Sequence, residues 1–150
     1  MNPLDYMKWG VDWAWGVPLI AVNVVIHVFC LAVFTAKVER RLGRLTQGRR
    51  FAPTFAAVMG IAVTLVTGLH ALEGAIWAAA YRLLDALPDN RSAMLYSLGA
   101  MTTHGHADIH LDPKWQMLGA LEALNGMLLF GLTTAFLFAM IQRVRPAGSR

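Results

Sequence analysis

Three long apolar runs, separated by short polar segments, dominate the chain. The first covers residues 17–36 and contains no charged side chain, and its length is close to the ~20 residues that a helix needs to cross the bilayer core. The second extends from about residue 53 to residue 84, and the third from about residue 113 to residue 142. Runs of this length predict three transmembrane helices in an all-α membrane protein.

The polar segment between the second and third runs contains a shorter apolar stretch, AMLYSLGAM. Asp89, Asn90 and Ser92 precede it and are suitable N-cap residues, so we expect a helix of about ten residues there. Such a helix is too short to cross the bilayer and too apolar to lie free in water. Irregular backbone at membrane depth survives only inside protein or beside water, which favours a re-entrant pore helix and filter loop. An extracellular helical hairpin is the alternative.

Composition and charge indicate the lipid bilayer as the surroundings of the chain. Hydrophobic residues make up 57% of the 150 residues, charged residues 15%, and the mean hydropathy is +0.49. The formal net charge is +4, but six basic residues lie between two apolar runs, so we do not expect nucleic acid as a partner. These are Lys37, Arg40, Arg41, Arg44, Arg49 and Arg50. Because basic loops stay in the cytoplasm, we expect the 37–50 loop and the C-terminus there, and the N-terminus outside.

Three strings in the second half of the chain carry a family resemblance: LHALEGAIWAAAY, LYSLGAMTTHGHADIHL and WQMLGALEALNGMLLFGLTTAFLFAMI. Through them, residues 69–144 resemble the pore domain of bacterial potassium-channel-like proteins of the two-helix pore-loop class. The resemblance implies a homotetramer in the bacterial inner membrane that conducts cations passively. It also implies a channel-like domain over residues 51–145. Residues 1–50 would then contain an interfacial segment, the first transmembrane helix and the basic loop. Residues 146–150 would form a short tail after the channel-like domain.

The filter position of the family is occupied by an altered sequence. Members typically carry TTxGYGD, whereas this chain reads TTHGHAD. The resemblance assigns the constriction to Thr102, Thr103, His104, Gly105, His106, Ala107 and Asp108. Ala107 replaces a glycine, and L-residues resist a left-handed backbone by roughly 1–2 kcal/mol per residue. We therefore expect cation conduction with altered or lost potassium selectivity.

Two interpretations of the loop histidines stay open. If the family backbone persists, His104 and His106 point away from the pore axis and act as struts. The candidate partners from the surrounding helices are then His70, Glu73, Tyr96 and Glu122. Alternatively, His104, His106, Asp108 and His110 alternate along the chain, and an extended backbone places them on one face. Such a set suits zinc or copper, and the protein would then be a metal-binding or accessory subunit of a larger membrane complex.

Ionisable and polar residues inside the apolar runs complete the candidates. Glu73 and Glu122 are expected to face the interior of a bundle, where we interpret them as scaffold for the pore helix. His27 and Asn23 are expected to hydrogen-bond to a neighbouring span. Gly126 is either a tight-packing position or, by the resemblance, a gating hinge. Since no nucleophile or phosphate loop is recognisable, we expect no enzyme activity and no required cofactor beyond cations in the pore or a bound transition metal.

Overall fold

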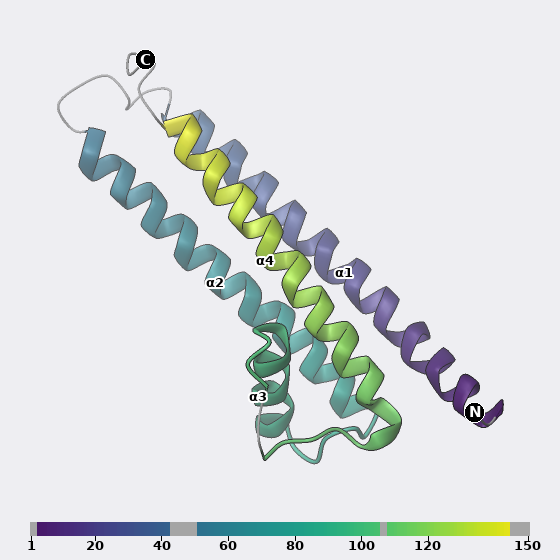
Figure 1. Cartoon of the computed structure of the whole chain (residues 1–150). Helices are drawn as coiled ribbons and strands as arrows, with labels where there is room; N and C mark the ends of the chain where they lie inside the picture. Colours follow the sequence, from purple (N-terminus) through teal and green to yellow (C-terminus); the bar gives the residue numbers. More distant parts are fainter. Residues whose placement is uncertain (1–2, 43–50, 106–107, 145–150) are drawn as a thin grey trace.

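The computed structural model describes residues 3–42, 51–105 and 108–144, and the regular elements of this part of the chain are helices (Figure 1). They are α1 (Pro3–Leu42), α2 (Phe51–Leu83), α3 (Asn90–Met101), the 3₁₀ turn η1 (Pro113–Trp115) and α4 (Gln116–Val144). In the described residues, three helices are long and apolar enough to cross a membrane, over Gly10–Arg40, Ala52–Leu83 and Pro113–Arg143. The prediction of an all-α fold with three helices long and apolar enough to cross a membrane is confirmed.

The first helix is longer than the apolar run that predicted it. It has 40 residues and continues past both ends of the expected 17–36 segment. Asp12 lies in this extension and is 2% exposed, and Gly16 packs against Leu118 and Leu121 of α4. The apolar run marks the stretch of α1 that matches a bilayer core, whereas contact with α4 keeps the polar beginning of the helix ordered as well.

The three long helices alternate in direction. α1 and α4 run parallel, as their paired residues show: the rings of Phe34 and Phe136 lie 5.9 Å apart, and Glu39 forms an ion pair with Arg143 further along both helices. α2 runs in the opposite direction, and in the view of Figure 1 α4 is drawn between α2 and α1. The basic ends of α1 and α4 therefore lie at one end of the bundle. Residues 43–50 and the predicted tail, residues 146–150, lie outside the described residues.

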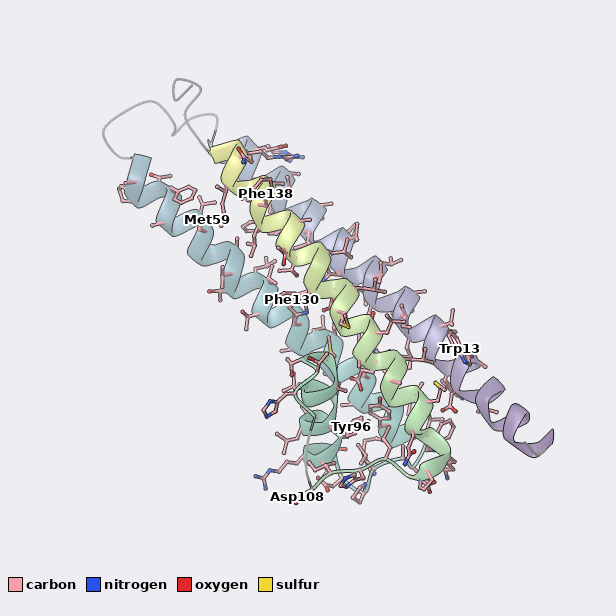
Figure 2. The ribbon with its side chains drawn as sticks, in the orientation of Figure 1. Trp13, Met59, Tyr96, Asp108, Phe130 and Phe138 are labelled. Carbon is pink, nitrogen blue, oxygen red and sulfur yellow. The ribbon has the colours of Figure 1, made fainter. Side chains whose placement is uncertain are left out.

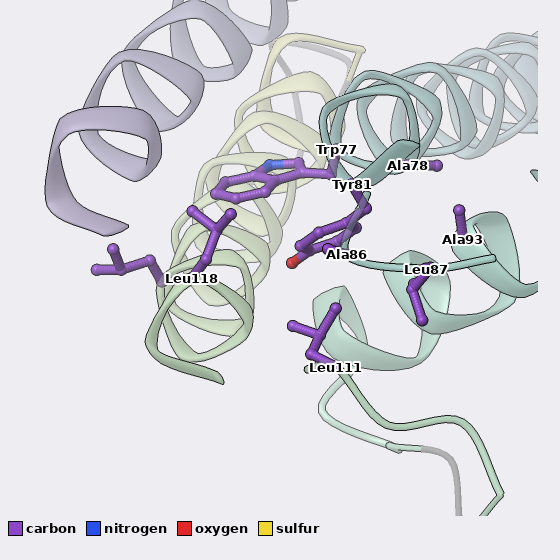
Figure 3. Packing of buried hydrophobic residues seen from close by; sticks show 9 residues of the cluster. Trp77, Ala78, Tyr81, Ala86, Leu87, Ala93, Leu111 and Leu118 are labelled. Atoms are coloured by element: carbon purple, nitrogen blue, oxygen red, sulfur yellow. The ribbon is translucent and has the colours of Figure 1, made fainter. Parts of the chain in front are cut away.

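The short helix α3 lies at the other end, beside the last turns of α2 and the first turns of α4 (Figure 1). Asp89 is its N-cap, as predicted, because the carboxylate accepts hydrogen bonds from Ser92 N at 2.9 Å and Ser92 Oγ at 2.7 Å. The larger buried apolar cluster surrounds α3 (Figure 3). It contains Trp77, Ala78, Tyr81, Ala86, Leu87, Ala93, Leu111, Leu118 and Leu121.

Large apolar side chains cover the outside of the bundle. Phe130 and Phe138 on α4 are 69% and 62% exposed, and Trp13 near the start of α1 is also exposed (Figure 2). In water, a surface of this kind would be unfavourable, whereas lipid or a further protein helix covers it without cost. The bundle is therefore built to be surrounded by an apolar medium.

Candidate functional site

A ring of four polar side chains joins the three long helices. His27 comes from α1, His70 and Glu73 from α2, and Thr133 from α4. His27 Nδ1 lies 2.9 Å from Glu73 Oε1, and His70 Nδ1 lies 3.1 Å from Glu73 Oε2. The Nε2 atoms of both imidazoles lie 3.1 Å from Thr133 Oγ1. Each imidazole thus has the carboxylate on one side and the hydroxyl on the other.

This polar ring is almost entirely buried. His27 and Glu73 have no exposed surface, and the side chain of His70 is 27% exposed. A carboxylate among apolar helices is expensive unless nearby groups balance its charge. The two imidazoles are the polar groups next to this carboxylate, and imidazole nitrogens are common metal ligands. The ring therefore brings three potential metal ligands together between α1 and α2.

Other buried polar side chains on the same helices have no partner within the described chain. Asn23 precedes His27 by one helical turn and is fully buried, yet neither of its amide atoms forms a hydrogen bond. The amide of Asn125 and Nε1 of Trp77 are in the same situation. The predicted contact between spans is therefore confirmed for His27, whereas Asn23 forms no hydrogen bond to a neighbouring span within the described residues.

The second buried carboxylate, Glu122, holds the short helix α3. Glu122 Oε2 accepts a hydrogen bond from the Tyr81 hydroxyl at 2.6 Å, and Oε1 accepts one from the Ser97 hydroxyl. Ser97 belongs to α3 and is also 2.7 Å from the carbonyl oxygen of Gly74 on α2. Burial raises the pKa of the neighbouring Tyr96 hydroxyl, and the Glu122 carboxylate adds to this effect. These hydrogen bonds connect α2, α3 and α4 at one point.

Glycines let α3 approach its neighbours closely. A Cβ on Gly126 would overlap the backbone of Met101, the last residue of α3. A Cβ on Gly119 would overlap the hydroxyl of Tyr96, whereas Gly131 has nothing within 4 Å. The position of Gly126 is thus explained by tight packing of α4 against the end of α3, which is one of the two roles expected from the sequence.

The turn after α3 has an unusual backbone. Thr103 has φ +58° and Gly105 has φ +67°, both in the left-handed region. This conformation is uncommon for a β-branched residue such as Thr103 and costs it roughly 1–2 kcal/mol. The turn is nevertheless bonded to the helix, because the N–H groups of Thr103 and Gly105 each donate to a carbonyl of its last turns at 3.0 Å. The Thr102 hydroxyl donates to another at 2.7 Å. Residues 102–105 are exposed.

The structure separates the residues predicted to act together at the filter position. Glu73 bonds to His27 of α1, and His70 bonds to Thr133 of α4. Tyr96 lies in α3, and Glu122 bonds to Ser97 of that helix. His106 and Ala107 lie outside the described residues. Among the His, Cys, Asp and Glu side chains that the structure describes, the set with ligand atoms within 4.8 Å of one another is His27, His70 and Glu73. The described loop residues His104, Asp108 and His110 are not part of that set.

Several residues of these sites were not recognised in the sequence. The Thr133 hydroxyl lies against the two imidazoles, and the hydroxyls of Tyr81 and Ser97 donate to Glu122. Hydroxyl-bearing residues are too common in apolar helices to stand out. The spacing of His70 and Glu73, three residues apart on one helix face, was a usable signal. What it did not indicate was that His27, 43 positions before His70, completes the site.

Comparison with protein-family models, with curated proteins and with solved structures finds no match for this chain. The interpretation of its function therefore rests on its own residues and their geometry.

Proposed function

We propose that this chain is a pore-loop, cation-channel-like protein that assembles as a homotetramer and conducts passively, with altered or lost potassium selectivity. The observation that carries the proposal is the position of α3 and the turn after it. Ser97 of α3 bonds to Gly74, nine residues before the end of α2, which is a depth of about 14 Å along that helix. Met101 packs on Gly126, ten residues into α4, which is about 15 Å from its start.

These depths support a re-entrant segment. α3 begins and the following segment ends at the same end of the bundle, so the chain would enter the bilayer and return without crossing it (Figure 1). A hydrocarbon core is about 30 Å thick, so a depth of about 15 Å would bring the turn near its middle. The exposed polar turn at residues 102–105 would be unfavourable against lipid. The turn would be stable if further copies of the chain and a water-filled path surrounded it in place of lipid.

The charge distribution of α3 fits a cation better than an anion. Its C-terminus carries the negative end of the helix dipole and is directed toward the turn. Pore-loop channels use oxygen atoms of the backbone to replace the hydration shell of a cation. In this proposal the segment from Thr102 to Asp108 forms the constriction, and the Glu122, Tyr81 and Ser97 hydrogen bonds keep α3 aimed at it.

The proposed orientation follows from the basic residues. Lys37, Arg40 and Arg143 lie at the end of the bundle opposite to α3. Because basic segments stay in the cytoplasm, α3 and the N-terminus would face outward from the inner membrane of a bacterial cell, and the C-terminus inward. The bilayer and three further copies of the chain are the proposed partners.

A flux assay in liposomes tests the proposal. The purified chain should pass K⁺ or Na⁺, and native mass spectrometry of the detergent-solubilised protein should give a tetramer. Gly105→Ala should reduce the flux, because alanine resists the φ of +67° there. Gly131→Ala is the matched control: both positions have open space for a Cβ, but Gly131 lies in a regular helix, so flux should persist. A monomeric chain without flux would contradict the proposal.

A further inference from the structure

We propose that His27, His70 and Glu73 form a binding site for a divalent transition-metal ion, with Zn²⁺ as the best fit, and that Thr133 orients the two imidazoles. The ligand atoms of the three residues lie within 4.8 Å of one another. Two imidazole nitrogens and a carboxylate oxygen are a common set of three protein ligands for zinc. The site lies on α1, α2 and α4, apart from α3 and the loop histidines, so it does not depend on the proposed channel function.

The first argument is that the polar ring lacks one hydrogen when both imidazoles are neutral and Glu73 is ionised. A neutral imidazole carries one N–H, and the single hydroxyl hydrogen of Thr133 can be donated to only one of the two Nε2 atoms near it. At least one imidazole must therefore direct its N–H toward Thr133. Its Nδ1 lone pair then faces the Glu73 carboxylate, at 2.9 Å from Oε1 for His27 or 3.1 Å from Oε2 for His70. Two lone pairs at this distance repel each other unless a proton or a metal ion lies between them.

The second argument distinguishes a metal ion from a proton. A shared proton lies on the line between its donor and acceptor. His27 Nδ1 and Glu73 Oε1 meet this condition at 2.9 Å, but Glu73 Oε2 accepts no hydrogen bond although His70 Nδ1 is 3.1 Å away. A metal ion does not have to lie on the line between two of its ligands. In a tetrahedral zinc site with bonds of about 2.0–2.1 Å, neighbouring ligand atoms are about 3.3 Å apart. The observed distances are 2.9 Å from His27 Nδ1 to Oε1 and 3.1 Å from His70 Nδ1 to the other carboxylate oxygen, Oε2. Each is short of the tetrahedral value by no more than a few tenths of an ångström.

The third argument is the role of Thr133. In metal sites, the imidazole nitrogen that does not bind the metal usually donates to an oxygen, which fixes the tautomer and the orientation of the ring. Thr133 Oγ1 lies 3.1 Å from the Nε2 atoms of both histidines and has two lone pairs to accept from them. This arrangement leaves both Nδ1 atoms free to bind a metal on the side of Glu73.

The site would connect the spans and keep one coordination position for a further ligand. Three protein ligands leave the fourth position of a tetrahedral ion open. Zn²⁺ and one carboxylate carry a net charge of +1, so an anionic fourth ligand such as hydroxide or chloride would make the buried site neutral. His70 is the partly exposed ligand, at 27%, and marks the side from which ion and ligand enter.

Metal content of the full chain, purified in detergent without chelator, tests this inference. We expect one Zn²⁺ per chain after addition of Zn²⁺ and removal of the excess, as measured by native mass spectrometry. Glu73→Gln should abolish this retention, and Thr133→Val, which keeps the side-chain shape, should weaken Zn²⁺ affinity by about 10–100-fold. Two matched controls should retain Zn²⁺ like the wild type: Glu122→Gln, which alters the other buried carboxylate, and the combined substitution of His104, His106 and His110 by Ala.

A measurement on the unaltered chain covers the case in which a variant does not fold. Substitution of Zn²⁺ by Co²⁺ should give the intense visible absorption of a tetrahedral ion with nitrogen and oxygen ligands, and added Zn²⁺ should raise the thermal unfolding temperature. If the variant with His104, His106 and His110 replaced by Ala no longer retained Zn²⁺, the metal would lie in the loop, and the inference would be overturned. A chain that retains no Zn²⁺ and shows no Co²⁺ absorption would overturn it as well, and would leave the ring as a set of hydrogen bonds between the long helices.

Discussion

Glu73 and Glu122 are both fully buried, but they face different partners and join different helices. Glu73 lies between the imidazoles of His27 and His70, whereas Glu122 accepts hydrogen bonds from the hydroxyls of Tyr81 and Ser97. A hydroxyl rotates and donates its hydrogen wherever an acceptor lies, so Glu122 is satisfied without any added cation. An imidazole has two nitrogens in fixed positions, so its single N–H cannot rotate toward a different acceptor, and Glu73 Oε2 is left without a hydrogen bond beside His70.

The two regions also differ in what they hold in place. The Glu73 region joins α1, α2 and α4, the three long helices. The Glu122 region joins α2 and α4 to α3, with Gly126 allowing the end of α3 to approach. The comparison indicates that the first region fixes the bundle and the second fixes the direction of α3 and the turn after it. Four substitutions test this division.

The largest expected effect is that of His27→Leu. The change removes the hydrogen bond to Glu73 Oε1 and leaves a fully buried carboxyl group without this partner, which should lower the free energy of unfolding by about 3 kcal/mol. Unfolding by sodium dodecyl sulfate in mixed micelles measures the change. Asn23→Leu is the matched control one turn earlier on α1. It removes amide atoms that have no partner, so stability should stay equal or rise. Equal losses in both variants would show that the Glu73 region has no special role.

Gly126→Ala should have the next largest effect and act on the second region. The added methyl group would overlap the backbone of Met101, which has no rotamer to change, so we expect a loss of about 2 kcal/mol in the free energy of unfolding. Gly131→Ala, on the same helix, meets nothing within 4 Å and should raise stability by about 0.5 kcal/mol, since alanine favours helices. The same unfolding titration compares both variants. A stable Gly126→Ala chain would refute close packing of α3 on α4.

Tyr81→Phe should have a moderate effect on the Glu122 region. It removes the 2.6 Å hydrogen bond to Glu122 Oε2, and hydrogen bonds between membrane helices are typically worth about 0.6–2 kcal/mol, so we expect a loss near 1 kcal/mol. Tyr96→Phe removes a hydroxyl that lies near Glu122 but forms no described hydrogen bond with it. The loss in the free energy of unfolding should therefore be smaller than for Tyr81→Phe. Zn²⁺ retention should be unchanged in both variants. A loss of Zn²⁺ in Tyr81→Phe would show that the two carboxylate regions are coupled.

The sequence was a sufficient basis for predicting the long helices, because their apolar runs are continuous and their lengths match a bilayer. It was also sufficient for the cap at Asp89, since capping depends on residues only three positions apart. The pairing of Glu73 with His27 was not predictable, because it depends on the register between α1 and α2 rather than on any local pattern. The extension of α1 around Asp12 was missed for the same reason, since a polar residue there is buried only by packing against α4.

The smallest expected effect is at the other end of α3, where Asp89→Ala removes the N-cap. Hydrogen bonds from the backbone N–H and then the hydroxyl of Ser92 hold the pKa of the Asp89 carboxyl below its usual 3.8. A carboxyl group whose pKa is lower in the folded than in the unfolded chain stabilises the fold at pH values above its unfolded-state pKa. This stabilisation is lost as the pH falls through its folded-state pKa. At neutral pH, Asp89→Ala should therefore unfold at a slightly lower denaturant concentration than the wild type, and the difference should close below about pH 3.8.

Ser92→Ala keeps the backbone donor and removes only the hydroxyl, so its loss should be smaller still. A difference that persists in acid would mean that Asp89 acts through something other than its charge. If the cap proves as important as Glu122, the direction of α3 is determined at its exposed beginning as much as at its buried contact with Ser97.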